Sequence, residues 1–203
     1  GEVAPRVLEL LAGYMAELVV GDPVLLATDV GPVIDREALA MLEAHAQKVT
    51  AGARWSHRVR LPDACAAGRF FAPLAVEIAH IEDLEREVFG PIVHIVRYEA
   101  AKLDAVVDAV NARGFGLTLG VQTRIDSLAQ HIARRARVGN VYVNRNMIGA
   151  VVGVQPFGGC GLSGTGPKAG GPHYLHRFAT EQTITVNTAA VGGNATLLSL
   201  SEK

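Results

Sequence analysis

The stretch Leu117–Asn144, with the sequence LTLGVQTRIDSLAQHIARRARVGNVYVN, decides the fold. Its two ends, Leu117–Thr123 and Val141–Asn144, are short runs of β-branched and apolar residues, which are typical of strands. Between them, apolar residues recur at helical spacing and a glycine follows: Leu128, Ile132, Ala136 and Gly139. This order favours two parallel strands, because a helix is the usual way back across a sheet.

The same alternation of helix and strand runs through the rest of the chain. Apolar residues at helical spacing predict helices from Pro5 to near Gly21, from an N-cap at Asp35 to about Gly52, and from Leu103 to Gly114. Apolar and β-branched runs predict further strands at Phe70–Ile78, Ile92–Tyr98 and Thr183–Asn187. We therefore expect an α/β fold with a mixed or parallel sheet flanked by helices.

The composition excludes several classes of protein. The chain has 203 residues, and its 19 Lys plus Arg against 20 Asp plus Glu lack the cationic surplus that nucleic-acid binding needs. The uncharged stretches 147–167 and 182–201 are interrupted by Gly, Pro or Asn, so neither is a continuous apolar membrane helix. We expect a globular chain with no nucleic-acid partner and no transmembrane segment.

The cysteines and histidines do not predict a reactive centre. Cys65 and Cys160 are far apart and form neither a disulfide framework nor a zinc motif. Neither has the helix amino terminus or neighbouring cation that activates a thiol, so both are interpreted as structural. The seven histidines lack metal-ligand spacing, and we expect no metal. With no signal peptide visible, a cytoplasmic location is expected.

The segment Gly149–Pro172 is rich in Gly and Pro, and a long loop of this kind is more often functional than accidental. Within it Gly159–Gly164 matches the dinucleotide pattern GxGxxG. That pattern binds phosphate only where a helix begins at the loop, and Pro167 and further glycines follow instead. The run therefore predicts a functional loop that is not a phosphate cradle.

The sequence Glu87–Pro91, EVFGP, places a carboxylate and an aromatic ring two residues apart before a Gly-Pro turn. On an extended segment, residues two apart point the same way, so Glu87 could bind a ribose while Phe89 packs a flat ring. Taken alone, the five residues favour an ordinary turn before a strand, with a solvated glutamate.

Several motifs in register resemble the aldehyde dehydrogenase superfamily: EVFGP, GFGLTLGV at 114–121, GNVYVN at 139–144, PFGG at 156–159 and LSGTG at 162–166. TDVGPVID at 28–35 and NRNMIGAVVGVQPFGG at 144–159 look most like the glutamate semialdehyde dehydrogenases, in particular the carboxy-terminal part of bifunctional enzymes of proline utilisation. The resemblance implies a partial catalytic domain at 1–180, followed at 181–203 by an oligomerisation strand and a tail.

In that family a cysteine thiolate attacks the aldehyde, hydride passes to NAD, and a glutamate activates the water that hydrolyses the thioester. The resemblance places the cysteine, the glutamate and the Rossmann half upstream of Gly1, so this chain is expected to hold no catalytic residue and to be inactive alone. FAD would belong only to an attached proline dehydrogenase domain, which is absent here.

By the same resemblance, Glu87 and Phe89 are cofactor-binding residues, Glu87 for the nicotinamide ribose and Phe89 beside the nicotinamide ring. Gly149 and Ala150 match the loop that anchors the substrate carboxylate through backbone N–H groups, because glycine permits a close approach. Phe157 matches an aromatic residue that lines the aldehyde tunnel.

Two alternatives stay open. Thr183–Asn187 resembles the arm that pairs with a partner subunit in a homo-oligomer, but it could equally be a terminal strand docked on its own core. The chain could also be a noncatalytic assembly module of the same family. An assembly module has no need of a nicotinamide contact or a carboxylate anchor, so Glu87 and Gly149 favour the enzyme.

Overall fold

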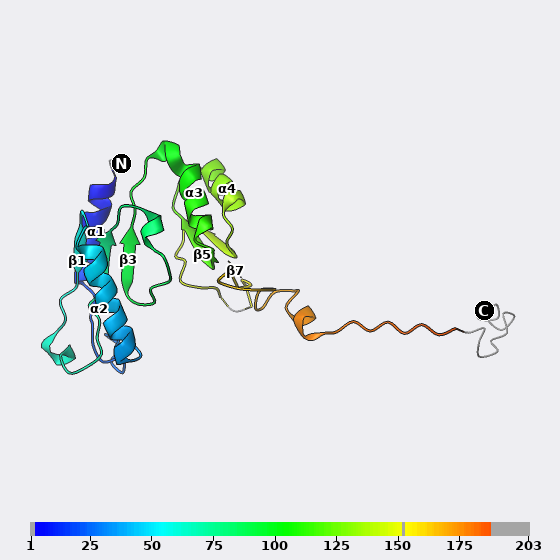
Figure 1. The fold of residues 1–203 in the computed structure, drawn as a ribbon, viewed down its shortest axis with the longest axis horizontal. Helices are drawn as coiled ribbons and strands as arrows, with labels where there is room; N and C mark the ends of the chain where they lie inside the picture. The colour runs from blue at the N-terminus through cyan, green and yellow to red at the C-terminus, as the bar shows by residue number, and fades with distance from the viewer. Residues whose placement is uncertain (1–2, 152, 188–203) are drawn as a thin grey trace.

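The computed structural model describes residues 3–151 and 153–187 (Figure 1). The four α-helices are α1 (Ala4–Ala16), α2 (Arg36–Thr50), α3 (Leu103–Ala112) and α4 (Asp126–Arg135). The strands are β1 (Ser56–Arg58), β2 (Leu74–Glu77), β3 (Ile92–Ile95), β4 (Phe115–Gly116), β5 (Thr118–Val121), β6 (Asn140–Val143) and β7 (Cys160–Gly161). Short 3-10 helices are η1 (Asp63–Cys65), η2 (Ile81–Asp83), η3 (Ala100–Lys102) and η4 (Leu175–Phe178).

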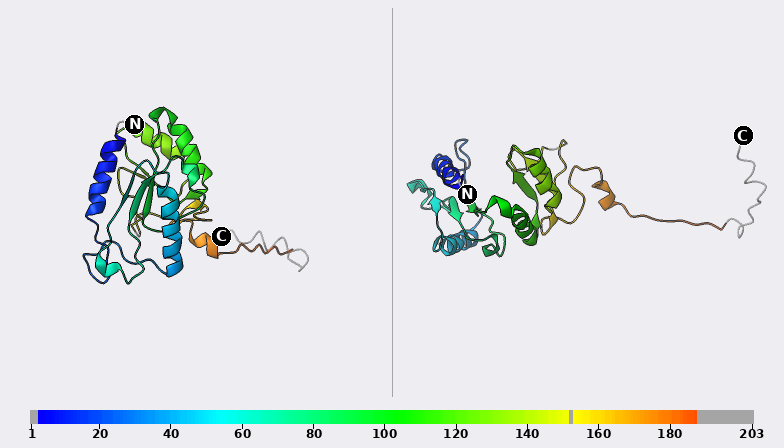
Figure 2. Two further views of the ribbon diagram at one scale, coloured as in Figure 1. Left: turned by 60° about the vertical axis from the view of Figure 1, so that its left-hand side comes forward. Right: turned by 90° about the horizontal axis from the view of Figure 1, so that it is seen from above.

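Strands β1, β2 and β3 form a mixed sheet in which β2 pairs antiparallel with β1 and parallel with β3. Helices α1 and α2 lie on opposite sides of this sheet (Figure 2). Side chains of β2 alternate between them: Leu74 and Val76 pack with Leu42 of α2, and Ala75 packs with Met15 of α1. All four residues of β2 are buried, as expected of a strand covered on both faces.

The predicted start of helix α2, with Asp35 as the N-cap, is confirmed. The Asp35 carboxylate accepts a hydrogen bond from the Ala38 N–H at 2.7 Å and so caps the first turn. Helix α1 ends at Ala16, earlier than predicted. The chain leaves the helix there because Val20 forms a parallel bridge with Val30, and backbone pairing replaces the last helical turn.

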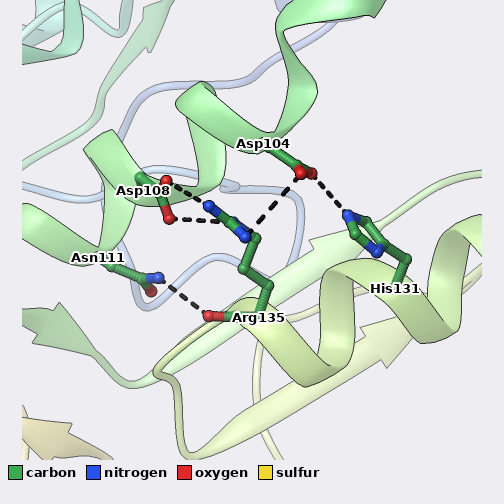
Figure 3. Close-up of polar contacts among 5 residues, drawn as sticks. All are labelled: Asp104, Asp108, Asn111, His131 and Arg135. Atoms are coloured by element: carbon green, nitrogen blue, oxygen red, sulfur yellow. Dashed lines mark hydrogen bonds and ion pairs between the residues drawn. The ribbon is translucent and has the colours of Figure 1, made fainter.

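Strands β5 and β6 form a second, parallel pair, as the sequence predicts. Their core consists of residues from α3, β5 and α4, namely Val107, Val121, Ala129 and Ile132. Polar side chains join α3 to α4 at the surface (Figure 3). Asp104 contacts His131 at 2.6 Å, and Asp108 accepts two hydrogen bonds from Arg135 at 3.0 and 2.5 Å. Being exposed, these pairs orient the helices more than they stabilise them.

Asn111 adds a third link between these two helices. Its Nδ2 donates to the Arg135 carbonyl at 3.0 Å, and its Oδ1 accepts from the Arg137 N–H at 2.7 Å. One amide therefore fixes the point where α4 ends against α3.

The prediction of a terminal strand at Thr183–Asn187 is not confirmed, because the single chain forms no strand among the described residues there. A strand needs a neighbour for its N–H and C=O groups, and residues 179–187 lead away from the α/β body (Figure 1). The tail beyond residue 187 lies outside the described residues. The described strands also form three separate sheets, where one layer was expected.

None of the described helices combines the length and apolar character needed to cross a membrane.

Candidate cofactor and substrate site

The EVFGP turn has one inward and two outward side chains. Val88 packs against the core around Leu42, while Glu87 is exposed and Phe89 is 83% exposed. Gly90 is needed here because a Cβ at this position would lie 2.4 Å from Cδ2 of Leu42. The turn is thus fixed to the core by its apolar side and presents the carboxylate and the ring at the surface.

Glu87 lines a cavity of about 390 Å³ whose other walls come from η2 and the residues after it, from β3, from the end of α3, from β4 and β5, and from the glycine-rich loop. Arg113, Phe115 and Ser163 are among these wall residues. Ser163 reaches the cavity because its hydroxyl accepts a hydrogen bond from the Gly116 N–H at 3.1 Å. The EVFGP, GFGLTLGV and LSGTG motifs, distant in sequence, therefore meet at one cavity.

His94 lies in the wall of the same cavity and pairs with His45 of α2, with 2.8 Å between their Nε2 atoms. Burial lowers the pKa of both imidazoles, and the positive charges of Lys48 and Arg86 lower that of His45 further. Both rings are therefore neutral at pH 7, with one Nε2–H donating to the other ring. Within the described ranges, no three potential metal-ligating side chains gather at one point.

The glycines of the run 159–164 serve close backbone packing. A Cβ at Gly159 would lie 2.6 Å from the Ser163 carbonyl oxygen, and one at Gly164 would lie 2.4 Å from that of Gly159. Gly161 has a φ of 62°, which favours glycine. In the described part of the chain no α-helix follows the run, so it lacks the helix amino terminus of a dinucleotide cradle.

The two cysteines contact backbone carbonyls. Sγ of the buried Cys65 lies 3.6 Å from the Val20 oxygen, and Sγ of Cys160 lies 3.0 Å from the Arg137 oxygen. Among the described residues neither thiol contacts a histidine or an acid, the kind of base that activates a nucleophile.

Gly149 and Ala150 lie on a loop that leaves the end of β6. We call this loop, residues 145–151 and 153–158, the anchor loop. Gly149 has no positive φ, and a Cβ there would meet nothing within 4 Å. Among the described residues, neither the Gly149 nor the Ala150 N–H donates to a protein acceptor. Neither packing nor backbone conformation within the described chain requires glycine at 149, and neither amide uses its N–H on a described protein group.

Phe157 is half-buried near the end of the anchor loop. It forms an antiparallel bridge with Ala169, with both N–H···O distances at 3.0 Å. Neither Phe157 nor Gly149 lines the cavity of Glu87. The structure thus gathers the predicted cofactor residues on the EVFGP turn and the predicted substrate residues on the anchor loop. Their roles stay predictions.

Two residues that sequence reasoning missed hold the anchor loop. Asn140 hydrogen-bonds the backbone of Pro156 and Gly158, and Asn144 hydrogen-bonds that of Thr123. A signal was present in the sequence, since asparagines stand at both ends of the run VYV and asparagine favours turns and left-handed backbone.

Comparison with known proteins connects this geometry to a family. The model described as "Aldehyde dehydrogenase family" matches residues 1–184. The bifunctional protein PutA of Escherichia coli is 51% identical over 182 residues, which are 87% of this chain and 14% of that protein. The 1-pyrroline-5-carboxylate dehydrogenase 1 of Halalkalibacterium halodurans is 32% identical over 188 residues, which are 91% of this chain and 35% of that protein.

Solved structures agree with the sequence comparisons. A mutant of proline utilization A (PutA) from Bradyrhizobium japonicum superimposes with a TM-score of 0.85 at 56% identity, covering 93% of this chain and 19% of that chain. The resemblance to proline utilisation enzymes found in the motifs is thereby confirmed, and the chain spans only a small part of these relatives. The α/β architecture, the motifs in register and the match over 1–184 agree: the chain belongs to the aldehyde dehydrogenase family.

Proposed function

We propose that this chain is the carboxy-terminal portion of an NAD-dependent L-glutamate γ-semialdehyde dehydrogenase, also called 1-pyrroline-5-carboxylate dehydrogenase, which oxidises the semialdehyde to glutamate in proline catabolism. The names of the relatives support the reaction. The observation that carries the substrate assignment is the anchor loop, where the Gly149 and Ala150 amides, which have no acceptor among the described residues, lie on the same loop as the half-buried Phe157.

The net reaction consumes the aldehyde, NAD⁺ and water and yields the carboxylate, NADH and two protons. NAD, when bound, supplies the hydride acceptor. The nucleophilic cysteine and the glutamate base would come from outside this chain, which agrees with the lack of a base beside Cys65 or Cys160 in the described ranges. What this chain supplies is the binding of both reactants.

At the cofactor end, the donor set of the EVFGP turn fits a nicotinamide riboside. The exposed Glu87 carboxylate is an acceptor for ribose hydroxyls, and the exposed Phe89 ring offers an apolar face to a flat ring. Val88, packed into the core, keeps the turn from moving when a ligand binds.

At the substrate end, the Gly149 and Ala150 amides donate hydrogen bonds to the α-carboxylate, a charge-assisted contact that neutral aldehydes lack. Phe157 packs against the aliphatic part of the substrate. The absence of a side chain at Gly149 leaves room for the carboxylate to approach the backbone.

For assembly, we propose a homo-oligomer in which Thr183–Asn187 pairs with a partner subunit. Ile184 and Val186 alternate along this segment and are 77% and 65% exposed, which suits a strand completed by another chain. Residues 1–180 would then form the partial catalytic domain and 181–203 the arm and tail. Free thiols at Cys65 and Cys160 suit a reducing cytoplasm.

Two measurements test the function. The isolated chain, mixed with NAD and glutamate semialdehyde, should give no increase in NADH absorbance over a blank without protein. E. coli PutA in which this chain replaces the matching segment, here called grafted PutA, should retain semialdehyde-dependent NADH formation. Turnover by the isolated chain would contradict the proposal that the nucleophile and the base come from outside it. A correctly folded grafted PutA that oxidises proline but not the semialdehyde would contradict the proposed function.

A further inference from the structure

Strand β6 has an asparagine at its start whose amide fixes the returning end of the anchor loop. Asn140 is only 8% exposed. Its Nδ2 donates to the Pro156 carbonyl at 3.1 Å, and its Oδ1 accepts from the Gly158 N–H at 3.3 Å. The two bonds lie on either side of Phe157, so one side chain sets the place of that ring relative to the sheet.

A second asparagine fixes the departing end of the loop. Asn144, directly after β6, has a φ of 55° and is the one non-glycine residue with positive φ in the described ranges. Its Oδ1 accepts from the Thr123 N–H at 2.9 Å, and its Nδ2 donates to the Thr123 carbonyl at 2.8 Å. The side chain thus replaces a strand partner for Thr123, the second residue after β5, while the left-handed backbone turns the chain into the anchor loop.

Neighbouring contacts extend this attachment along the first residues of the loop. Gln122 donates through Nε2 to the Arg145 carbonyl at 3.0 Å, and the Arg145 guanidinium lies 4.6 Å from the centre of the Tyr142 ring. Met147 lies over Gly120, since a Cβ at Gly120 would be 2.9 Å from its Sδ. The direction in which the loop leaves the sheet is therefore set by the ends of β5 and β6.

Burial of apolar side chains cannot hold the middle of this loop, because Ile148 is 92% exposed and Val151 and Val154 are exposed as well. Its order depends on hydrogen bonds, namely the two asparagine attachments and backbone bonds such as those of Phe157 with Ala169 and of Gln155 with Val151. If either attachment is lost, the loop populates several conformations. A ligand that needs one of them then has a higher apparent Kd, because only a fraction of the molecules can bind it.

We propose that Asn140 and Asn144 are positioning residues that hold the two ends of the anchor loop, so that the Gly149 and Ala150 amides and the Phe157 ring act on one substrate molecule. This inference rests on the proposed function, because it assigns the loop to the semialdehyde. Neither asparagine has to touch the substrate, and neither lies on the EVFGP turn.

The test uses the substitutions Asn140→Ala and Asn144→Gly in grafted PutA. Glycine at 144 tolerates the left-handed backbone at no steric cost and removes the two side-chain hydrogen bonds. We expect the loss of both bonds to weaken substrate binding about tenfold, which corresponds to about 1.4 kcal/mol. Each variant should raise KM for glutamate semialdehyde about tenfold, with KM for NAD and kcat unchanged within about twofold.

Asn111→Ala is the matched control, because Asn111 also makes one donated and one accepted hydrogen bond to backbone groups, but between α3 and the end of α4. It should lower the melting temperature about as much as the other two substitutions and leave KM for the semialdehyde unchanged. Equal KM increases in all three variants would overturn the inference, since loss of general stability would then explain them.

Amide hydrogen exchange in the isolated chain gives a readout independent of activity. Asn144→Gly should accelerate exchange at residues 145–151 and leave α3 unchanged, and unchanged exchange at 145–151 overturns the inference. Gly149→Val distinguishes failure of the positioning inference from failure of the proposed function. If it raises KM for the semialdehyde while the asparagine variants do not, positioning fails and the proposed function stands. If none of these variants moves that KM, the assignment of the loop to substrate fails.

Discussion

The β1–β3 sheet and the anchor loop are ordered by opposite means. In the sheet, Leu42, Ala75 and Val76 are 0% exposed, and two helices cover both faces. In the anchor loop, apolar side chains are exposed, and order comes from side-chain amides and close backbone contacts. The comparison teaches that the stability of this chain and the geometry of its candidate substrate site reside in different residues and can be changed separately.

The largest expected effect is on the sheet. Leu42→Ala removes a fully buried side chain packed with Phe71, Leu74 and Val76, and it should lower the free energy of unfolding by about 2–5 kcal/mol. Denaturant unfolding of the isolated chain measures it. Leu26→Ala, at a fully exposed leucine, is the control and should change stability little. Similar losses in both variants would mean that the core is not packed as described.

A smaller effect is expected where the loop returns to the sheet. A Cβ at Gly139 would lie 1.8 Å from the Gly158 carbonyl oxygen, whereas one at Gly149 would meet nothing within 4 Å. Gly139→Ala should therefore destabilise the chain by about 1–3 kcal/mol, as overpacking does, and Gly149→Ala should not. Melting temperatures of the two variants decide this, and equal values would contradict the division between packing glycines and ligand glycines.

A pH effect should distinguish the sheet from the loop further. The lowered pKa values of His45 and His94 mean that the unfolded chain, with histidines near 6.5, binds protons more readily than the folded chain. The free energy of unfolding is therefore highest above pH 6.5, where the histidines are neutral in both states. It decreases as the pH falls from 6.5 toward the lowered pKa values of the two histidines in the folded chain. Unfolding measured from about pH 7.5 to about pH 5 should show this decrease. The double substitution His45→Gln and His94→Gln should flatten it, and an equally steep slope would assign the effect elsewhere.

Local patterns predicted the scaffold well. The spacing of Leu42 and Ala46 and the cap at Asp35 define α2, and the apolar runs define β2 and β5, because each signal lies within one turn or one strand. The terminal strand at Thr183–Asn187 stays a prediction, because alternating side chains indicate only a preference for extended structure. A strand also needs a partner, and the described chain gives it no strand to pair with.

The candidate site was less predictable from local pattern. Glu87 and Phe89 are both exposed, but only Glu87 lines the cavity, so their shared role in binding the cofactor stays a prediction. Asn140 and Asn144 escaped notice as site residues because their hydrogen-bond partners are 16 to 21 residues away. Such contacts depend on how the loop returns to the sheet, which no periodicity in the sequence encodes.

The central claim is that the anchor loop binds the substrate carboxylate through an open backbone at Gly149. Gly149→Val in grafted PutA tests it most directly. The described chain has room for the valine side chain, but that side chain would occupy the space that a bound carboxylate needs. We expect KM for glutamate semialdehyde to rise at least about tenfold, with KM for NAD unchanged. Equal increases in both values, or no increase for the semialdehyde, would contradict the account.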